Sequence, residues 1–248
     1  MKVNEKLIEL FEEIVEYVSG EFDVFEIDLK DGKQIETSAL MLKILSSSNV
    51  IVKLCKDGNY PEADVLARTN LEASFHMVSI IKTKNGLKEY LAKHEYGKSK
   101  MVNSLISDSE LMKTFRLDKS DLIKNLEEIK VNIESYDLGH EKRCMQTAKD
   151  AGMTSDYQGA YRLLSQAVHV LPGYLEKYYF KIENGKILGF SDCFVEKKLS
   201  NALLSSIYTL LISFKQFLFF LKNKQNQFIR EEEFELRFRE LLEKDLKK

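Results

Sequence analysis

The chain has 248 residues, of which 44% are hydrophobic and 31% are charged. This hydrophobic content is enough to build a core, which excludes wholesale disorder. The net charge of -2 excludes a global field that would attract nucleic acid or an anionic membrane, although it leaves room for a local basic patch. Two prolines and 11 glycines leave few breaks and favour long helices over a many-stranded sheet.

The cysteines indicate a reducing environment. Cys55, Cys144 and Cys193 are far apart, odd in number and form no CxxC pair. This spacing argues against a disulfide framework and against a zinc site.

The first residues form an acidic amphipathic pattern without the uninterrupted apolar run of a signal peptide. We therefore expect a cytoplasmic protein.

The N-terminal part of the chain is predicted to form helices joined by short breaks. Helical patterns run from about residue 4 to 19 and from about residue 37 to 55. The segment between them, residues 21–34, is predicted to be a small hairpin or an ordered linker, because it mixes apolar residues with an Asp-Gly turn signal. Gly58 suits the left-handed position that ends a helix, and Pro61 suits the first turn of the next one.

The helix predicted over residues 61–82 is apolar on nearly every side, which is typical of a buried helix. It nevertheless carries Arg68, Glu72 and His76, each four residues from the last and therefore aligned along one stripe. Buried charges are very costly unless they are paired. We therefore predict an Arg68–Glu72 ion pair that is extended by groups from a neighbouring helix.

Two further helices are predicted over residues 86–107 and 119–135, and an irregular connection follows them. Later in the chain, Asn184-Gly185 is a turn signal between apolar residues, which makes the surrounding segment a hairpin or a surface loop. The tail, residues 230–248, is predicted to be a charged amphipathic helix.

Residues 202–221 are long enough and apolar enough to span a bilayer. Lys215 and Gln216 would lie within such a span, and hydroxyl residues dilute its apolar face. We interpret this segment as a buried helix of a bundle and expect no stable membrane association. Membrane association through it is a third, lower-ranked hypothesis.

The stretch over residues 157–170 is predicted to form a helix that is capped at Ser155, with Gln158 as its capping-box partner. The helix is expected to stop at Pro172. At about 100° per residue, its core face consists of Ala160, Leu164, Ala167, Val168 and Leu171.

Polar side chains border that core face. Tyr157 and Tyr161 lie at its edge, and Ser165 lies on the flank beyond. Arg162 and His169 share this flank, about 10 Å apart. In the simpler interpretation, the tyrosines bury their rings at the core edge and the histidine binds a carbonyl near the helix end.

The functional interpretation requires the two polar stripes to meet. If Tyr161, Ser165 and His169 face the polar stripe of the helix over residues 61–82, they form a polar pocket inside an apolar bundle. Such a pocket can hold histidines with shifted pKa values and is the first place to look for function.

Other chemistries have less support in the sequence. It contains no Walker A loop, GxGxxG, HExxH or GxSxG motif, and no repeated Glu-x-x-His of a di-iron bundle. Glu72, His76 and His169 are able to hold one metal ion, but their spacing is nonspecific. We expect neither a metal site nor a cofactor.

Three stretches resemble a bacterial family, the "domain of unknown function 5677" family. Its tyrosine-, serine- and histidine-containing signature is similar to MQTAKDAGMTSDYQGAYRLLSQAVHV. Its R-x-x-x-E helix is similar to ADVLARTNLEASFHMVSII, in which Arg68 and Glu72 hold those positions, and YLAKHEYGKSK fits between the two. The chain departs from the pattern by placing Val170 and Leu171 before Pro172. The resemblance covers roughly residues 38–220 and implies an all-helical domain without an established activity.

The same signature helix is more distantly similar to the HEPN (higher eukaryote and prokaryote nucleotide-binding) superfamily. Ribonucleases of that superfamily use an arginine followed by four to six residues and a histidine, and Arg162 and His169 match this spacing, with Leu163 where a polar residue is common. The resemblance implies RNA cleavage without a metal, at a site formed across a dimer. The histidine would take a proton from a ribose 2′-hydroxyl, and the arginine would stabilise charge on the phosphate.

We therefore predict an all-α antiparallel helical bundle with helical extensions at both ends and a candidate hairpin. Its expected parts are residues 1–36, a helix and linker; residues 37–222, the main bundle; and residues 223–248, a charged helix. The first functional hypothesis is a HEPN-like homodimer that acts on RNA or nucleotides in stress or phage defence, with Arg162 and His169 as its catalytic residues. The alternative is a noncatalytic ligand-binding or protein-interaction module with a structural polar network, formed by Arg68, Glu72, His76, Tyr157, Tyr161 and Ser165.

Overall fold

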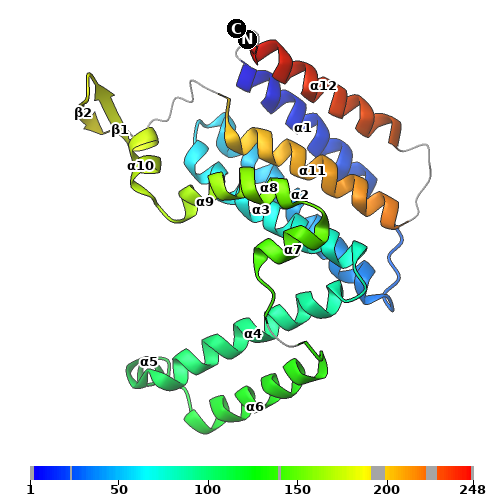
Figure 1. Cartoon of the computed structure of the whole chain (residues 1–248), viewed down its shortest axis with the longest axis vertical. Coiled ribbons are helices and arrows are strands. Elements are labelled where there is room, and N and C mark those ends of the chain that lie inside the picture. Colours follow the sequence, from blue (N-terminus) through cyan, green and yellow to red (C-terminus); the bar gives the residue numbers. More distant parts are fainter. Residues whose placement is uncertain (1–2, 23, 139–140, 191–198, 222–227, 247–248) are drawn as a thin grey trace.

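The computed structural model in Figure 1 describes residues 3–22, 24–138, 141–190, 199–221 and 228–246. Most of these residues are helical, and the strands among them form one short hairpin. The prediction of an all-α bundle is confirmed. Cys193 lies outside the described residues, Cys55 is buried and Cys144 is half-buried.

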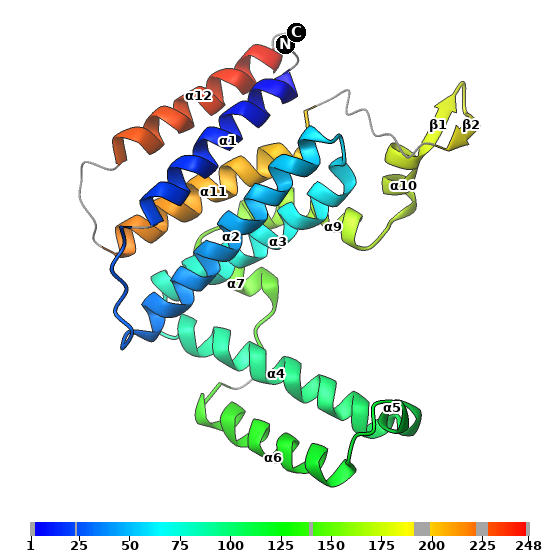
Figure 2. The ribbon, with the colours of Figure 1, turned by 180° about the vertical axis from the view of Figure 1, so that it is seen from behind.

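The body of the molecule is a bundle of long helices that bury one continuous apolar core. The start of α1 lies beside the end of α12, so these two helices run antiparallel (Figures 1 and 2). Phe75 of α3 and Phe214 of α11 are fully buried, and the ring of Phe22 stacks on that of Phe217. The two helices α3 and α11 meet where the Ser213 hydroxyl donates to the Ser74 hydroxyl at 2.8 Å. The helices of this body are α1 (Val3–Phe22), α2 (Gly32–Lys56), α3 (Tyr60–Lys82), α11 (Asn201–Phe220) and α12 (Phe228–Leu246).

Local capping chemistry sets the ends of α2. The helix begins at Gly32, earlier than predicted, because the Asp31 carboxylate accepts hydrogen bonds from the backbone N–H groups of Lys33 (2.9 Å) and Gln34 (3.3 Å). It ends before Gly58, which has the expected left-handed conformation with φ of 74°. Residues 24–31 form no strand, so the segment between α1 and α2 is a linker and not a hairpin.

A helical arm projects from this body (Figures 1 and 2). It consists of α4 (Gly86–Ser107), α5 (Ser109–Thr114) and α6 (Lys119–Ser135), and the bounds of α4 and α6 agree with the prediction. The arm has a small apolar core of its own, formed by Val102, Leu126 and Ile129.

The stretch after the arm is less regular than predicted. It consists of α7 (Cys144–Ala151), α8 (Thr154–Asp156), a π-helical turn (Tyr157–Tyr161), α9 (Arg162–Val168) and α10 (Pro172–Tyr179). The predicted cap at Ser155 is wrong: Gly152, with φ of 74°, ends α7, and the chain re-enters a helix at Thr154 with Ser155 already inside it. The stop at Pro172 is also incomplete, because α9 ends at Val168 and Pro172 opens α10.

The predicted core face is correct only in part. Leu164 and Ala167 are buried as expected, and Ala160 is half-buried. Val168 and Leu171 are exposed, which contradicts the prediction. The prediction spaces all residues at about 100°, as in one continuous α-helix, whereas α9 ends at Val168 and Leu171 lies beyond it.

The Asn184-Gly185 segment forms a hairpin and not a loop. Strands β1 (Phe180–Glu183) and β2 (Lys186–Phe190) pair antiparallel across this turn. Asn184 and Gly185 have φ of 51° and 73°, the left-handed backbone that the favoured two-residue turn requires. The preceding helix α10 is tied to α3, because Tyr174 donates a hydrogen bond of 3.0 Å to the buried Asp64 carboxylate.

Among the residues that the structure describes, two helices, α2 and α11, are long and apolar enough to cross a membrane by length and composition. More than half of the apolar window of each is buried inside the bundle. Burial of this kind is typical of core helices, and α11 packs against α1, α2 and α3.

Candidate functional site

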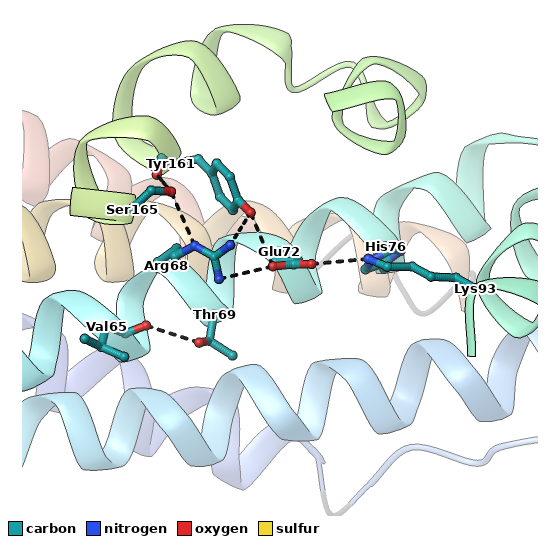
Figure 3. A network of polar contacts seen from close by, with 8 residues as sticks. All are labelled: Val65, Arg68, Thr69, Glu72, His76, Lys93, Tyr161 and Ser165. Carbon is teal, nitrogen blue, oxygen red and sulfur yellow. Dashed lines mark hydrogen bonds and ion pairs between the residues drawn. The ribbon is translucent and has the colours of Figure 1, made fainter. Parts of the chain in front are cut away.

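Arg68 lies at the centre of a polar network between α3 and the helix that carries Tyr161 (Figure 3). Its guanidinium donates hydrogen bonds to the Tyr161 hydroxyl at 2.6 Å and to the Ser165 hydroxyl at 3.3 Å. A third nitrogen lies 3.4 Å from the Glu72 carboxylate. The predicted Arg68–Glu72 pair is therefore confirmed, together with its extension to a neighbouring helix.

Tyr161 joins the two polar stripes. Its hydroxyl donates to the Glu72 carboxylate at 3.4 Å while it accepts from Arg68, and the guanidinium carbon lies 4.7 Å from the centre of its ring. The Tyr157 ring stacks on the Tyr161 ring with centroids 5.0 Å apart, and both rings approach Phe75. The tyrosines thus bury their rings at the core edge, as expected, and the Tyr161 hydroxyl belongs to the network.

Lys93 of α4 completes the network, although the sequence analysis did not identify it. Its ammonium lies 3.2 Å from the Glu72 carboxylate and 2.9 Å from Nε2 of His76 (Figure 3). Because an ammonium has only hydrogens to donate, Nε2 of His76 is the acceptor and carries no proton. Lys93 lies on another helix, and no spacing pattern links it to α3. Only the folded arrangement reveals it.

The surroundings of the network shift several pKa values. Burial by itself would raise the pKa of Glu72, but the positive charges of Lys93 and Arg68 outweigh it and lower that pKa. Burial and the neighbouring Lys93 ammonium lower the pKa of His76 to about 4. Burial raises the pKa of Tyr161 and of the nearby Cys144 thiol, so neither is ready to act as a nucleophile. The network at neutral pH therefore holds paired charges and a neutral histidine.

Arg162 and His169 lie apart from this network. Arg162 begins α9 and His169 follows its last residue, and both side chains are exposed to solvent. The expectation that His169 faces the stripe on α3 together with Tyr161 and Ser165 is not met. Tyr161 is buried and Ser165 is half-buried against α3, whereas the exposed Arg162 and His169 point away from the core.

Glu72, His76 and His169 do not converge. Glu72 and His76 both contact Lys93, and His169 lies at the exposed end of α9. Within the described residues, no three His, Cys, Asp or Glu side chains are grouped closely enough to hold a metal ion.

Comparison with protein families identifies a family for this chain. The profile of a family of unknown function (DUF5677) matches residues 36–187, which is more than half of the chain. The matched region begins within α2 and ends within the β1–β2 hairpin, so it includes every member of the network. No curated protein and no solved structure matches the chain.

Proposed function

Because the chain belongs to this family of unknown function, its activity has to be inferred from its own residues, and we propose that it acts on RNA or nucleotides as a HEPN-like protein of the bacterial cytosol. The observation that supports this proposal is the exposure of Arg162 and His169 at the two ends of α9. A phosphodiester chain can reach both side chains without any opening of the bundle.

The polar network gives α9 a fixed position. Arg68 binds Tyr161, which immediately precedes α9, and Ser165, which lies in its middle. A catalytic pair needs its side chains held in a constant geometry, because misplacement of reacting groups is costly. In the proposed reaction His169 removes the proton from a ribose 2′-hydroxyl, the 2′-oxygen forms a bond to phosphorus, and the bond from phosphorus to the 5′-oxygen breaks while Arg162 stabilises the charge on the phosphate. The leaving 5′-oxygen takes a proton from water. None of these steps calls on a metal ion.

The surface around Arg162 and His169 supports a homodimer. Leu163, Val168 and Val170 are large apolar side chains that are exposed on or beside α9. Exposed apolar side chains such as these are available for contact with a second copy. We propose that two copies approach through the exposed side of α9 and form the RNA site between them, in a protein that serves stress or phage defence.

The test is RNA cleavage in the presence of a metal chelator. End-labelled RNA is incubated with the wild-type chain and with His169→Ala, with His94→Ala as the matched control because His94 is also exposed but lies on the arm. Wild type and His94→Ala should cleave, whereas His169→Ala should be slower by about a hundredfold or more, the usual contribution of a general base. Equal survival of RNA with the wild type and His169→Ala would refute the proposal.

The second candidate function is a noncatalytic ligand-binding or interaction module. The observation in its favour is that the polar side chains satisfy one another, as in a structural network. Arg68 contacts Tyr161 and Glu72, and Glu72 also contacts Lys93. In this case RNA survives with every variant, including the wild type, while substitution of Arg68 still lowers stability. RNA cleavage by the wild type and His169→Ala, together with the stability of an Arg68 variant, therefore separates the two candidates.

A further inference from the structure

A pocket lies where the arm joins the body of the molecule. Its volume is about 390 Å³, within the range of small-molecule sites. A second, smaller space of about 10 Å³, enough for one water molecule, lies beside His76 and Thr147 and shares Glu89, Lys93 and Lys142 with the lining of the first. We call the larger space the outer pocket and the smaller one its inner end. The outer pocket is lined by Glu89, Ala92, Lys93 and Tyr96 of α4, by Lys142, and by Gln146 of α7.

Two ammonium groups reach both the outer pocket and its inner end. Lys93 binds Glu72 and His76, and Lys142 binds Glu89 and Asp150. An ammonium has three hydrogens to donate, and these contacts between described residues use two hydrogens of each. Each lysine therefore keeps one donor for an acceptor in the pocket.

The remaining lining suits the body of an organic molecule. The half-buried Tyr96 offers an aromatic ring, and Ala92 and Leu138 add apolar surface. The Gln146 amide donates to Asp150 at 3.1 Å, so its carbonyl oxygen remains for a polar group on the ligand. A pocket of this composition combines apolar contact with a few oriented polar groups.

The spare donors of the lining select the class of ligand. Glu72, Glu89 and Asp150 already contact the two ammonium groups, so the ligand is selected by the two spare N–H donors and not by an excess of positive charge in the lining. A wholly apolar ligand would strip water from both ammonium groups without replacing its hydrogen bonds. An acidic head satisfies both donors, and charge-assisted hydrogen bonds of this kind are the strong ones.

We propose that this pocket binds a small organic anion. Its phosphate or carboxylate head lies between the ammonium groups of Lys93 and Lys142, and its flat body lies along Tyr96. The pocket is built from α4, α7 and the segment before α7, whereas the proposed RNA contacts lie on α9. The inference therefore stands or falls independently of RNA cleavage.

The test measures binding of four small probes to the full chain by calorimetry and by NMR titration. Phenyl phosphate and benzoate each combine a head with a flat body, whereas inorganic phosphate has only the head and phenol only the body. At least one of the first two probes should bind saturably with one site per chain. Its affinity should exceed that of inorganic phosphate and phenol by about tenfold or more, since each part contributes. If phenyl phosphate binds more tightly than benzoate, the preferred head is a phosphate, and if benzoate binds more tightly, it is a carboxylate.

Variants then locate the binding. Lys142→Met and Tyr96→Leu should each weaken binding by about tenfold, the value of one charge-assisted hydrogen bond or one stacked ring. Lys88→Met is the matched control, because Lys88 is an exposed lysine of α4 outside the lining, and it should bind like the wild type. If Lys142→Met does not melt cooperatively, it is not folded, and the comparison of Tyr96→Leu with Lys88→Met then tests the location of the binding site.

Two results would overturn the proposal. One is the absence of saturable binding by both phenyl phosphate and benzoate at millimolar concentrations. The other is equal affinity of Tyr96→Leu and Lys88→Met. RNA cleavage by the same variants reports separately on α9, so loss of one property leaves the other measurable.

Discussion

Replacing Arg68 with methionine tests the network at its centre. Methionine retains an unbranched side chain but removes every contact with Glu72, Tyr161 and Ser165. Breaking a buried ion pair costs about 3–5 kcal/mol, whereas an exposed pair contributes about 0–1 kcal/mol. The Arg68 and Glu72 side chains are 21% and 28% exposed, so the cost falls between these limits. We expect Arg68→Met to lower the free energy of unfolding by about 2–3 kcal/mol.

Urea denaturation followed by circular dichroism measures this loss, and a double-mutant cycle assigns it to the pair. Glu72→Gln and the double variant should show a coupling energy between Arg68 and Glu72 of about 1 kcal/mol, because the two residues are in contact. Lys88→Met, on the exposed face of α4, should change the free energy of unfolding by less than about 0.5 kcal/mol. A loss for Arg68→Met no larger than that of Lys88→Met, or a coupling energy of zero, would refute a structural role for the network.

The remaining predictions concern a buried histidine and two glycines. Because the pKa of His76 falls from 6.5 to about 4 on folding, the unfolded chain binds more protons between these pH values, and the free energy of unfolding should fall as pH falls through this window. The full loss of unfolding free energy is about 3 kcal/mol. Urea denaturation at several pH values should show that the free energy of unfolding depends less on pH in His76→Gln than in the wild type. An equal pH dependence in the two proteins would contradict the lowered pKa of His76. Gly86→Ala should lower the melting temperature, because a Cβ there would lie 2.4 Å from the backbone oxygen of Ser79. Gly97→Ala, in open space on the same helix, should stabilise by about 0.5–1 kcal/mol, and similar melting shifts for the two glycine variants would count against this packing.

The helices could be predicted because their signals are local. The helical patterns over residues 86–107 and 119–135 predict α4 and α6 at their observed bounds. The early start of α2 was missed although its signal is also local: Asp31 was interpreted as part of a turn, whereas its carboxylate caps the helix through Lys33 and Gln34. The hairpin at Asn184-Gly185 was one of two alternatives, since the same dipeptide also suits a surface loop.

The candidate site could be predicted only within one helix. Arg68 and Glu72 are four residues apart, and the cost of burying an unpaired charge implies their pairing. Lys93 depends on the direction in which α4 leaves the bundle, and the hydrogen bond from Tyr174 to Asp64 depends on the path of the chain after α9. No pattern in the sequence encodes either contact, because each is set by packing between elements far apart along the chain.

The π-helical turn changes how a row of residues spaced by four runs around the helix. In an α-helix, four residues turn the chain by about 40° more than one full rotation, so a row spaced by four drifts steadily around the helix. A π-turn contains more residues than an α-turn, so each residue in it rotates by a smaller angle. Over residues 157–161 the row therefore drifts less, which keeps the Tyr157 and Tyr161 rings stacked.

That turn also connects stability at Arg68 with the position of α9. A π-turn is a rare conformation, and the last residue of this one, Tyr161, is hydrogen-bonded to Arg68 and Glu72. If those contacts were lost, relaxation of the turn to an α-helix would rotate everything that follows it. Arg162 and His169 follow directly, so the direction in which they face depends on a network that neither of them touches. The residues that fix the fold here and the residues proposed to contact RNA are therefore different sets, joined through one helical turn.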